Sequence, residues 1–164
     1  EATYQSDNTL ASTPLVDYTS LDAADTKFMA ITDPDTGEPI VTTASLFWGP
    51  PALRNTAMRI RNATMTGVTT SARETRVSSN SLNNQIGNYI TNQYVKLRTS
   101  SDTTWFYGNP MEAFIYSENW PLTVETVGAN GEMAFERDIV ARFKASERGA
   151  AGVMERRFAL KVTG

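Results

Sequence analysis

The sequence predicts an α+β fold in which two early helices are followed by mostly antiparallel strands. Apolar residues recur at helical spacing in residues 19–31 and 50–61, whereas apolar and polar residues alternate with a period of two from residue 122 onward. Hydrophobic residues make up 40% of the 164 positions, and seven Phe, six Tyr and three Trp are among them. A chain of this length and composition is expected to bury one core.

The first part of the chain is predicted to run from an arm into a helix. Residues 1–18 are polar and acidic, which indicates a flexible arm. Ser20 is placed to cap a helix over residues 19–31, with acids in its first turn. Its apolar stripe is formed by Leu21, Ala24, Phe28 and Ile31. Two prolines and a glycine in residues 33–39 predict a turn after this helix.

The middle of the chain is predicted to contain a strand, a helix and a long loop. β-branched and aromatic residues predict a strand over residues 40–48, and the two prolines that follow it open a helix that ends near residue 61. Residues 62–84 are rich in Ser, Thr and Asn and predict a long loop. Three further strands are expected within residues 85–99, 103–110 and 111–121.

The last part of the chain is predicted to be all strand. Asn130-Gly131 is a hairpin signal, and after it Phe143 falls on one face while Arg142 and Lys144 fall on the other. Gly149-Ala-Ala-Gly152 is interpreted as a turn that joins two half-buried strands, the second of which is residues 158–162. We therefore expect three parts: a flexible arm (1–18), an α+β domain with the long loop (19–121) and terminal strands (122–164).

The composition excludes several classes of chemistry. The chain has no Cys and no His, which excludes disulfides, thiolate or imidazole metal sites, and Ser-His or Cys-His nucleophiles. Paired carboxylates, Lys, Tyr or oxygen-ligand metal sites remain open to an enzyme. The first 20 residues lack a basic segment followed by an apolar block, and no run of about 18 apolar residues occurs, so neither a signal nor a membrane segment is expected.

The charge is small in sum but segregated along the chain. The net charge is −3, yet residues 1–53 carry one Lys and eight acids, while residues 54–98 carry seven bases and one acid. Blocks of opposite sign indicate complementary surfaces within one fold or between copies, although solvated faces that merely cluster in sequence give the same pattern.

Three candidate sites were weighed against structural alternatives. Glu112 and Glu118 beside Tyr116 and Trp120 resemble a glycosidase carboxylate pair, but two exposed acids on a short aromatic strand explain them better. Residues 33–38 (DPDTGE) lack calcium-loop spacing and indicate a plain turn. The basic residues of the last thirty positions fit nucleic acid poorly, because the aromatic residues among them fall on apolar faces. No cofactor and no metal site are predicted.

The order of several motifs resembles a known family. The segments are LDAADTKFMAITDPDTGEPI (21–40), TASLFWGPPALRNTAMRI (43–60), TTWFYGNP (103–110), NPMEAFIYSENWPLTVET (109–126) and GEMAFERDIVARFKASERGAAGVMERRFALKV (131–162). Together they resemble the major capsid, or head, proteins of tailed bacteriophages with the Hong Kong 97-like fold. Trp48-Gly49 departs from the family pattern, which has a valine before the two prolines, and the 62–84 loop has no clear counterpart.

The resemblance implies a structural phage or prophage capsid protein that self-associates into a shell around double-stranded DNA. It implies an axial domain with part of a peripheral domain, in a fragment, a processed product or a truncated form. Capsid copies are the expected partners, with scaffold or portal proteins besides, and the location is the virion capsid, assembled in the bacterial host cytoplasm. Alternatives are a non-viral shell, a β-rich interaction module or a carboxylate-dependent glycoside hydrolase. The candidate subunit-contact residues are Arg142, Lys144, Arg148, Arg156 and Arg157.

Overall fold

The computed structural model describes residues 7–71, 74–80, 87–127 and 142–164. The chain divides into two compact units. Unit 1 comprises the described residues up to Ala113 together with Glu155–Gly164, and unit 2 comprises those of Phe114–Met154. The division therefore differs from the expected boundary at residue 122, because the last ten residues return to unit 1.

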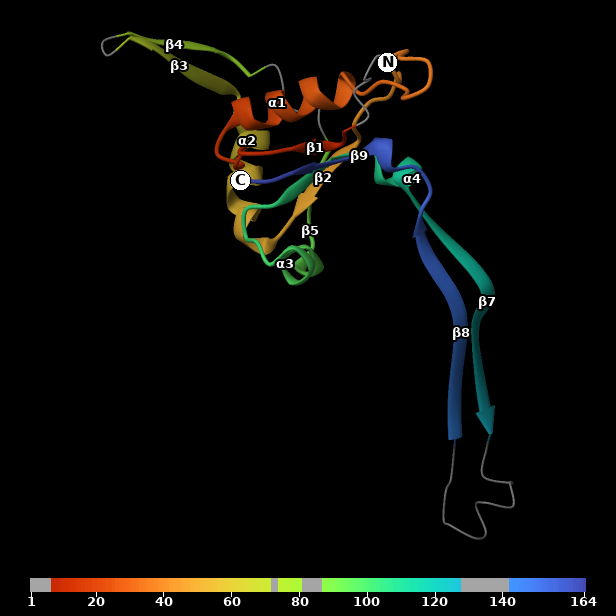
Figure 1. Cartoon of the computed structure of the whole chain (residues 1–164). Coiled ribbons are helices and arrows are strands. Elements are labelled where there is room, and N and C mark those ends of the chain that lie inside the picture. Colours follow the sequence, from red (N-terminus) through yellow and green to blue (C-terminus); the bar gives the residue numbers. More distant parts are fainter. Residues whose placement is uncertain (1–6, 72–73, 81–86, 128–141) are drawn as a thin grey trace. The chain divides into compact units, whose positions relative to one another are not determined.

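Unit 1 holds all the helices and most of the strands of the described residues (Figure 1). Its helices are α1 (Tyr18–Met29), α2 (Arg54–Asn62), α3 (Gln93–Thr99) and α4 (Pro110–Ala113), with the 3-10 turns η1 (Pro51–Leu53) and η2 (Arg156–Phe158). Its strands are β1 (Thr9–Leu10), β2 (Leu46–Gly49), β3 (Met65–Ser71), β4 (Glu74–Ser79), β5 (Tyr89–Thr91), β6 (Trp105–Gly108) and β9 (Ala159–Val162). None of these helices combines the length and apolar character that crossing a membrane requires.

A five-stranded sheet forms the centre of unit 1, in the order β1-β9-β6-β2-β5. β6 pairs antiparallel with both β2 and β9, whereas β1 runs parallel to β9 and β5 runs parallel to β2. The mixed α+β class is confirmed. Two of the four pairings in this sheet are parallel, but every strand pairing outside it in the described residues is antiparallel, so the prediction of mostly antiparallel strands is confirmed for the described chain. β1 also corrects the expected free arm over residues 1–18, since Thr9–Leu10 is hydrogen-bonded to the last strand.

The core lies between α1 and one face of this sheet. Trp105 and Tyr107 alternate with Phe106 along β6 and are at most 1% exposed. The ring of Phe28 on α1 meets that of Tyr107 edge to face at 5.7 Å, and the Tyr107 hydroxyl donates a hydrogen bond of 2.7 Å to Asp25. Burial, and then this bond to a carboxylate, raise the pKa of Tyr107. The core is completed by Leu15, Leu21, Ala24, Ile31, Phe47, Ala57, Ile60, Leu160 and Val162.

Helix α1 confirms the predicted helix, with a different cap. Asp17 caps it, because its carboxylate accepts a hydrogen bond of 2.9 Å from the backbone N–H of Thr19. Ser20 lies inside the first turn, where its hydroxyl donates to the carbonyl of Pro14 at 2.8 Å. The predicted Ser20 cap and the predicted acids in the first turn are therefore wrong.

Around the two prolines the sequence pattern holds, but the strand is shorter than expected. Of the predicted strand over residues 40–48, only the last three residues pair in the sheet, as part of β2 (Leu46–Gly49). Pro51 then opens η1, and α2 follows with Ala57 and Ile60 buried. A proline suits this first turn because its missing N–H would have no partner there.

The predicted loop over residues 62–84 contains a hairpin instead. β3 and β4 pair antiparallel from Met65 opposite Ser79 onward, and residues 72–73 and 81–86 lie outside the described part. Asn80 is buried where the hairpin returns, and its side-chain amide donates to the carbonyls of Ile60 and Ala63. Thr and Val have high strand propensity, which explains why a polar segment pairs here.

Two predicted strands are helical in part. Of the predicted strand over residues 85–99, the described part from residue 87 onward has a strand only at Tyr89–Thr91, after which Asn92 caps α3 through a 2.9 Å hydrogen bond from the N–H of Tyr94. Within residues 111–121 the chain first completes α4 and then enters the strand that starts at Phe114. Short apolar runs do not distinguish a helix from a strand, and here the cap at Asn92 marks the start of a helix.

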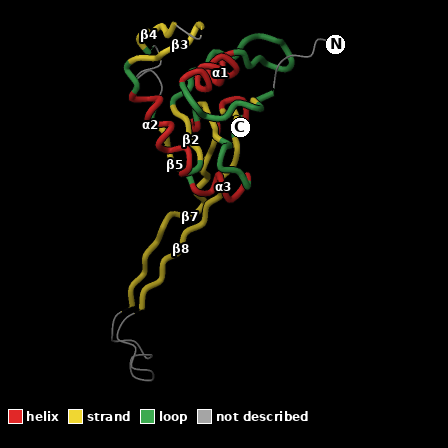
Figure 2. The backbone as a smooth tube through the Cα atoms, turned by 90° about the vertical axis from the view of Figure 1, so that its left-hand side faces the viewer, coloured by secondary structure: helices red, strands yellow, loops and turns green. Residues whose placement is uncertain are grey.

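Unit 2 consists, in its described part, of two antiparallel strands, β7 (Phe114–Val127) and β8 (Arg142–Val153), which run side by side in Figure 2. We call this pair the ribbon. The predicted turn at residues 149–152 is wrong, because those residues continue β8 opposite Ile115–Glu118. The partner of β8 is β7, while residues 159–162 join the sheet of unit 1. The Asn130-Gly131 hairpin signal lies outside the described residues.

Candidate functional site

The ribbon has two chemically different faces. β8 is continuous, so its odd-numbered and even-numbered residues face opposite sides, and the pairing with β7 transfers this alternation across the ribbon. The face that we call apolar carries Phe114, Tyr116, Val124, Phe143 and Val153, with the acids Glu118 and Glu147 among them. The charged face carries Glu125, Arg142, Lys144 and Arg148, together with Ile115 and Trp120.

Three of the five predicted contact residues gather on the charged face. Lys144 lies 3.7 Å from Glu125, but both side chains are more than 60% exposed, so this pair contributes little stability. Arg142 and Arg148 form no ion pair with any residue that the structure describes. Their guanidinium groups are therefore available to a partner.

The apolar face is exposed to solvent. Phe143 is 75% exposed, and Val124 and Val153 are each more than 60% exposed. The Tyr116 hydroxyl donates a 2.7 Å hydrogen bond to Glu147, which raises the pKa of Tyr116, and its ring lies over Gly149, where a Cβ would clash with it. A two-stranded ribbon with no covering layer is marginally stable in water. The described residues of the ribbon therefore leave apolar side chains exposed on this face.

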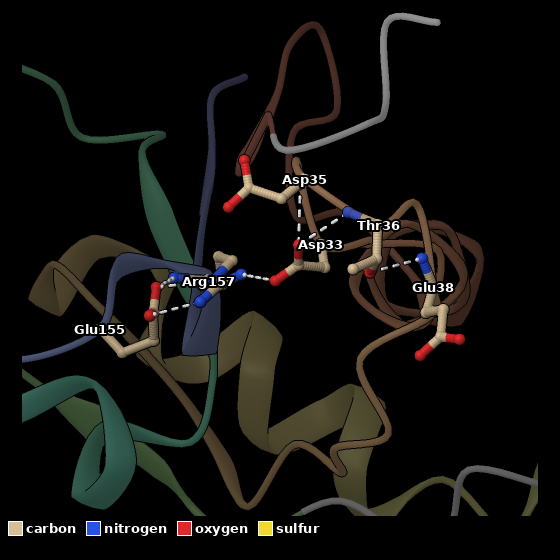
Figure 3. Close-up of polar contacts among 6 residues, drawn as sticks. All are labelled: Asp33, Asp35, Thr36, Glu38, Glu155 and Arg157. Atoms are coloured by element: carbon tan, nitrogen blue, oxygen red, sulfur yellow. Dashed lines mark hydrogen bonds and ion pairs between the residues drawn. The ribbon is translucent and has the colours of Figure 1, made fainter.

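The other two predicted contact residues lie in η2 of unit 1, and they differ in role. Arg157 donates to the two carboxylate oxygens of Glu155 at 2.9 and 2.8 Å and to Asp33 at 2.9 Å (Figure 3). These bonds raise the pKa of Arg157, and its hydrogen bonds are the main cause of a lowered pKa at Glu155. Arg157 is therefore a clamp within the chain, whereas its neighbour Arg156 is exposed.

The clamp explains the acidic turn after α1. The other carboxylate oxygen of Asp33 accepts backbone hydrogen bonds from Asp35 at 2.8 Å and Thr36 at 3.1 Å (Figure 3). These two bonds, and then Arg157, lower the pKa of Asp33. Residues 33–38 form a closed turn, as predicted, and their central carboxylate is already satisfied by protein donors.

The candidate carboxylate pair is divided between the two units. Glu112 lies on α4 of unit 1, whereas Glu118 lies on β7 of unit 2, opposite Gly149. Among the described residues, no group of three or more acidic side chains is arranged to hold a metal ion. The two acids are exposed side chains on separate elements.

Part of this arrangement has no local signal in the sequence. Glu155 is two residues from Arg157, a spacing that could have suggested their contact, but Asp33 is 124 residues away and no local pattern connects them. Phe114 and Tyr116 are also not predicted as part of an apolar face, because that face depends on the pairing of β7 with β8.

Comparison with known proteins places the chain in a family. A family model described as "Phage capsid protein" matches residues 1–162. The chain belongs to the phage capsid protein family. This confirms the resemblance found over the separate motifs and extends it to nearly the whole chain. Capsid proteins are structural proteins, and many copies of one assemble into a shell. This agrees with the prediction that the chain is not an enzyme.

The other comparisons add less. No curated protein matches the chain. Among solved structures, the chain is similar to the holo-SrpI encapsulin complex from Synechococcus elongatus PCC 7942, solved by cryo-electron microscopy, with 11% identity and a TM-score of 0.46. The similarity covers 98% of this chain and 51% of the encapsulin chain, so this capsid protein spans about half the length of that match.

Proposed function

We propose that this chain is a major capsid protein of a phage or prophage, with a Hong Kong 97-like arrangement, that self-associates into a head shell enclosing double-stranded DNA. Membership of the phage capsid family supports the proposal that copies of the chain assemble into a shell. The ribbon carries the proposal, because its described residues present an uncovered apolar face and an uncovered charged face. Both faces are explained if a neighbouring copy covers them.

The charged face is the proposed contact that sets the register between copies. Arg142 and Arg148 lie on the same face of β8, six residues apart, without an acidic partner in the described chain. Charges at the rim of an interface steer association and fix its register more than they add affinity. The apolar face, with Phe143 and Val124, supplies the area that contributes most of the association free energy.

The remaining expectations stay with this proposal. Non-specific contact with the packaged DNA, scaffold or portal partners, assembly in the host cytoplasm and location in the virion follow from the phage assignment. The prediction that the chain is a fragment or a truncated form also stays a prediction.

Charge reversal on the ribbon tests the proposal. Arg142→Glu combined with Arg148→Glu is expected to weaken concentration-dependent association, measured by light scattering after size exclusion, and to leave Tm unchanged. The matched control reverses two cations of unit 1, Lys27→Glu and Lys161→Glu. A lower Tm with unchanged association would contradict the contact role. Nuclease-resistant DNA within assembled particles separates a phage head from a shell that packages none.

A further inference from the structure

The two ends of the central sheet of unit 1 differ in charge. β2 is preceded by residues 33–45 and followed by α2, while the antiparallel β6 is preceded by the end of α3 and followed by α4. The acidic turn and α4 therefore lie at one end of these strands, and the first residues of α2 and the last residues of α3 lie at the other. Figure 1 shows α4 on one side of β2 and α2 and α3 on the other.

The first end is acidic and carries exposed apolar side chains. We define the acidic end as Asp35, Glu38 and Glu112 together with Val41 and Met111. Val41 is 96% exposed and Met111 is 86% exposed. An open hollow of about 490 Å³ lies between the segment of residues 40–43 and Glu112.

The turn of residues 33–38 within the acidic end is closed by hydrogen bonds inside the chain. The backbone N–H of Asp33 donates to the carbonyl of Glu38 at 2.9 Å, that of Gly37 donates to the carbonyl of Asp33 at 2.8 Å, and Arg157 clamps the Asp33 carboxylate. In Figure 3 the Glu38 carboxylate points away from Arg157, and no hydrogen bond or ion pair joins Arg157 to Asp35 or Glu38. A preorganised turn loses little conformational entropy when it binds.

The second end is basic and has a matching surface. We define the basic end as Arg54 and Arg98 together with Met58, Tyr94 and Leu97. Tyr94 and Leu97 are both 70% exposed, and Met58 is 41% exposed. Exposed Tyr, Met and Arg side chains are typical of the centre of protein interfaces.

The two arginines of the basic end have no ion-pair partner among the residues that the structure describes. Lys96 forms an ion pair with Asp102 at 2.8 Å, but Arg54 and Arg98 form no ion pair within the described residues. Beside Arg54 an open hollow of about 520 Å³ is lined by Met58, Asn88, Tyr89 and Thr91. This hollow follows β5, which is an edge strand of the sheet.

We propose that the acidic end of one copy binds the basic end of the next, with the segment that carries Val41 seated in the hollow beside Arg54. Asp35 and Glu38 then lie against Arg54 and Arg98. The contact is head to tail, since the two surfaces differ, and such contacts generate rings when the rotation closes. This inference rests on the proposed self-association and adds a contact to the one made by the ribbon.

Charge swapping on the full chain tests the pairing of the two ends. Asp35→Lys with Glu38→Lys, and separately Arg54→Glu with Arg98→Glu, are each expected to lower the association constant at least about tenfold, measured by analytical ultracentrifugation. The variant that carries all four substitutions regains complementary ends and is expected to recover self-association. Val41→Asp is expected to weaken association as well, and because Val41 is almost fully exposed, folding is unaffected.

The outcomes separate this contact from the proposed function. The control Asp22→Lys with Lys161→Glu makes one substitution of each kind away from both ends, with no net change in charge, and is expected to associate like the original chain. Equal weakening by the control, or no recovery in the fourfold variant, overturns the pairing. If the original chain associates and every variant matches it, this contact is wrong and the ribbon proposal stands. An original chain that stays monomeric at all concentrations overturns both.

Discussion

Removing the ribbon is expected to leave unit 1 folded. The ends of the ribbon meet in unit 1, where the backbone N–H of Glu155 donates to the carbonyl of Ala113 at 3.3 Å. A four-residue Gly-Ser linker therefore has room to replace residues 114–154, since hairpin loops of two to five residues are common. Within the described residues, no member of the core cluster lies in residues 114–154, so the deletion removes no core side chain.

The size of the effect follows from loop closure. Shortening the connection from roughly forty residues to about four reduces the closure entropy by (3/2)RT ln 10, which is about 2 kcal/mol in favour of the folded state. Pairing within the ribbon already restricts the longer connection, so this value is an upper limit. The variant without residues 114–154 is expected to unfold at a Tm equal to or slightly above that of the full chain.

Thermal unfolding and sedimentation are measured together, at a protein concentration where the full chain is monomeric, because assembly itself raises the apparent stability. The deletion is expected to remove association at higher concentration. A Tm well below that of the full chain would show that the ribbon supports the core of unit 1. Unchanged association would show that the ribbon is not a subunit contact.

The remaining predictions concern the clamp, the core of unit 1 and the ribbon. Arg157→Met is expected to lower Tm by a few degrees in differential scanning calorimetry, because it removes three charge-assisted hydrogen bonds, whereas Arg156→Met leaves Tm unchanged. The two carboxylates that Arg157 binds have lowered pKa values in the folded state. The stability that they contribute is therefore complete above their unfolded pKa values near 4 and is lost as the pH falls through the folded pKa values. A plot of Tm against pH below about pH 4.5 should be flatter for Arg157→Met than for the original chain. Leu160→Ala, at a fully buried site, is expected to cost about 2–5 kcal/mol in denaturant unfolding. Val124→Ala, on the exposed ribbon, should change the free energy of unfolding by about 0.5 kcal/mol or less.

The parts of the fold that were predicted correctly have local signals. The apolar stripe that includes Phe28 identified α1, and the prolines before α2 marked its start. The failures arose where long-range pairing decides the structure. Gly149-Ala-Ala-Gly152 has the composition of a turn, yet its small residues face the bulky side chains of β7, and this contact is invisible in the sequence of β8 alone.

The candidate site was predictable to the same extent. A period of two put Arg142 and Lys144 on one face of a strand, and the structure places them on the charged face of the ribbon. Arg148 joins them only because β8 continues through the expected turn. Sequence could not separate Arg156 from Arg157, since the clamp depends on Asp33 at the other end of the chain.

The two proposed contacts explain how a shell could form from surfaces that are individually weak. Exposed ion pairs contribute about 0–1 kcal/mol each and are screened by salt, so the charged face of the ribbon or one end of unit 1 alone holds two copies loosely. A copy that is held through one contact meets the second at a high effective concentration. Rising salt should therefore weaken assembly by screening both ionic contacts, without removing the contribution of the apolar face, and loss of either contact should cost far more association than the ion pairs it removes.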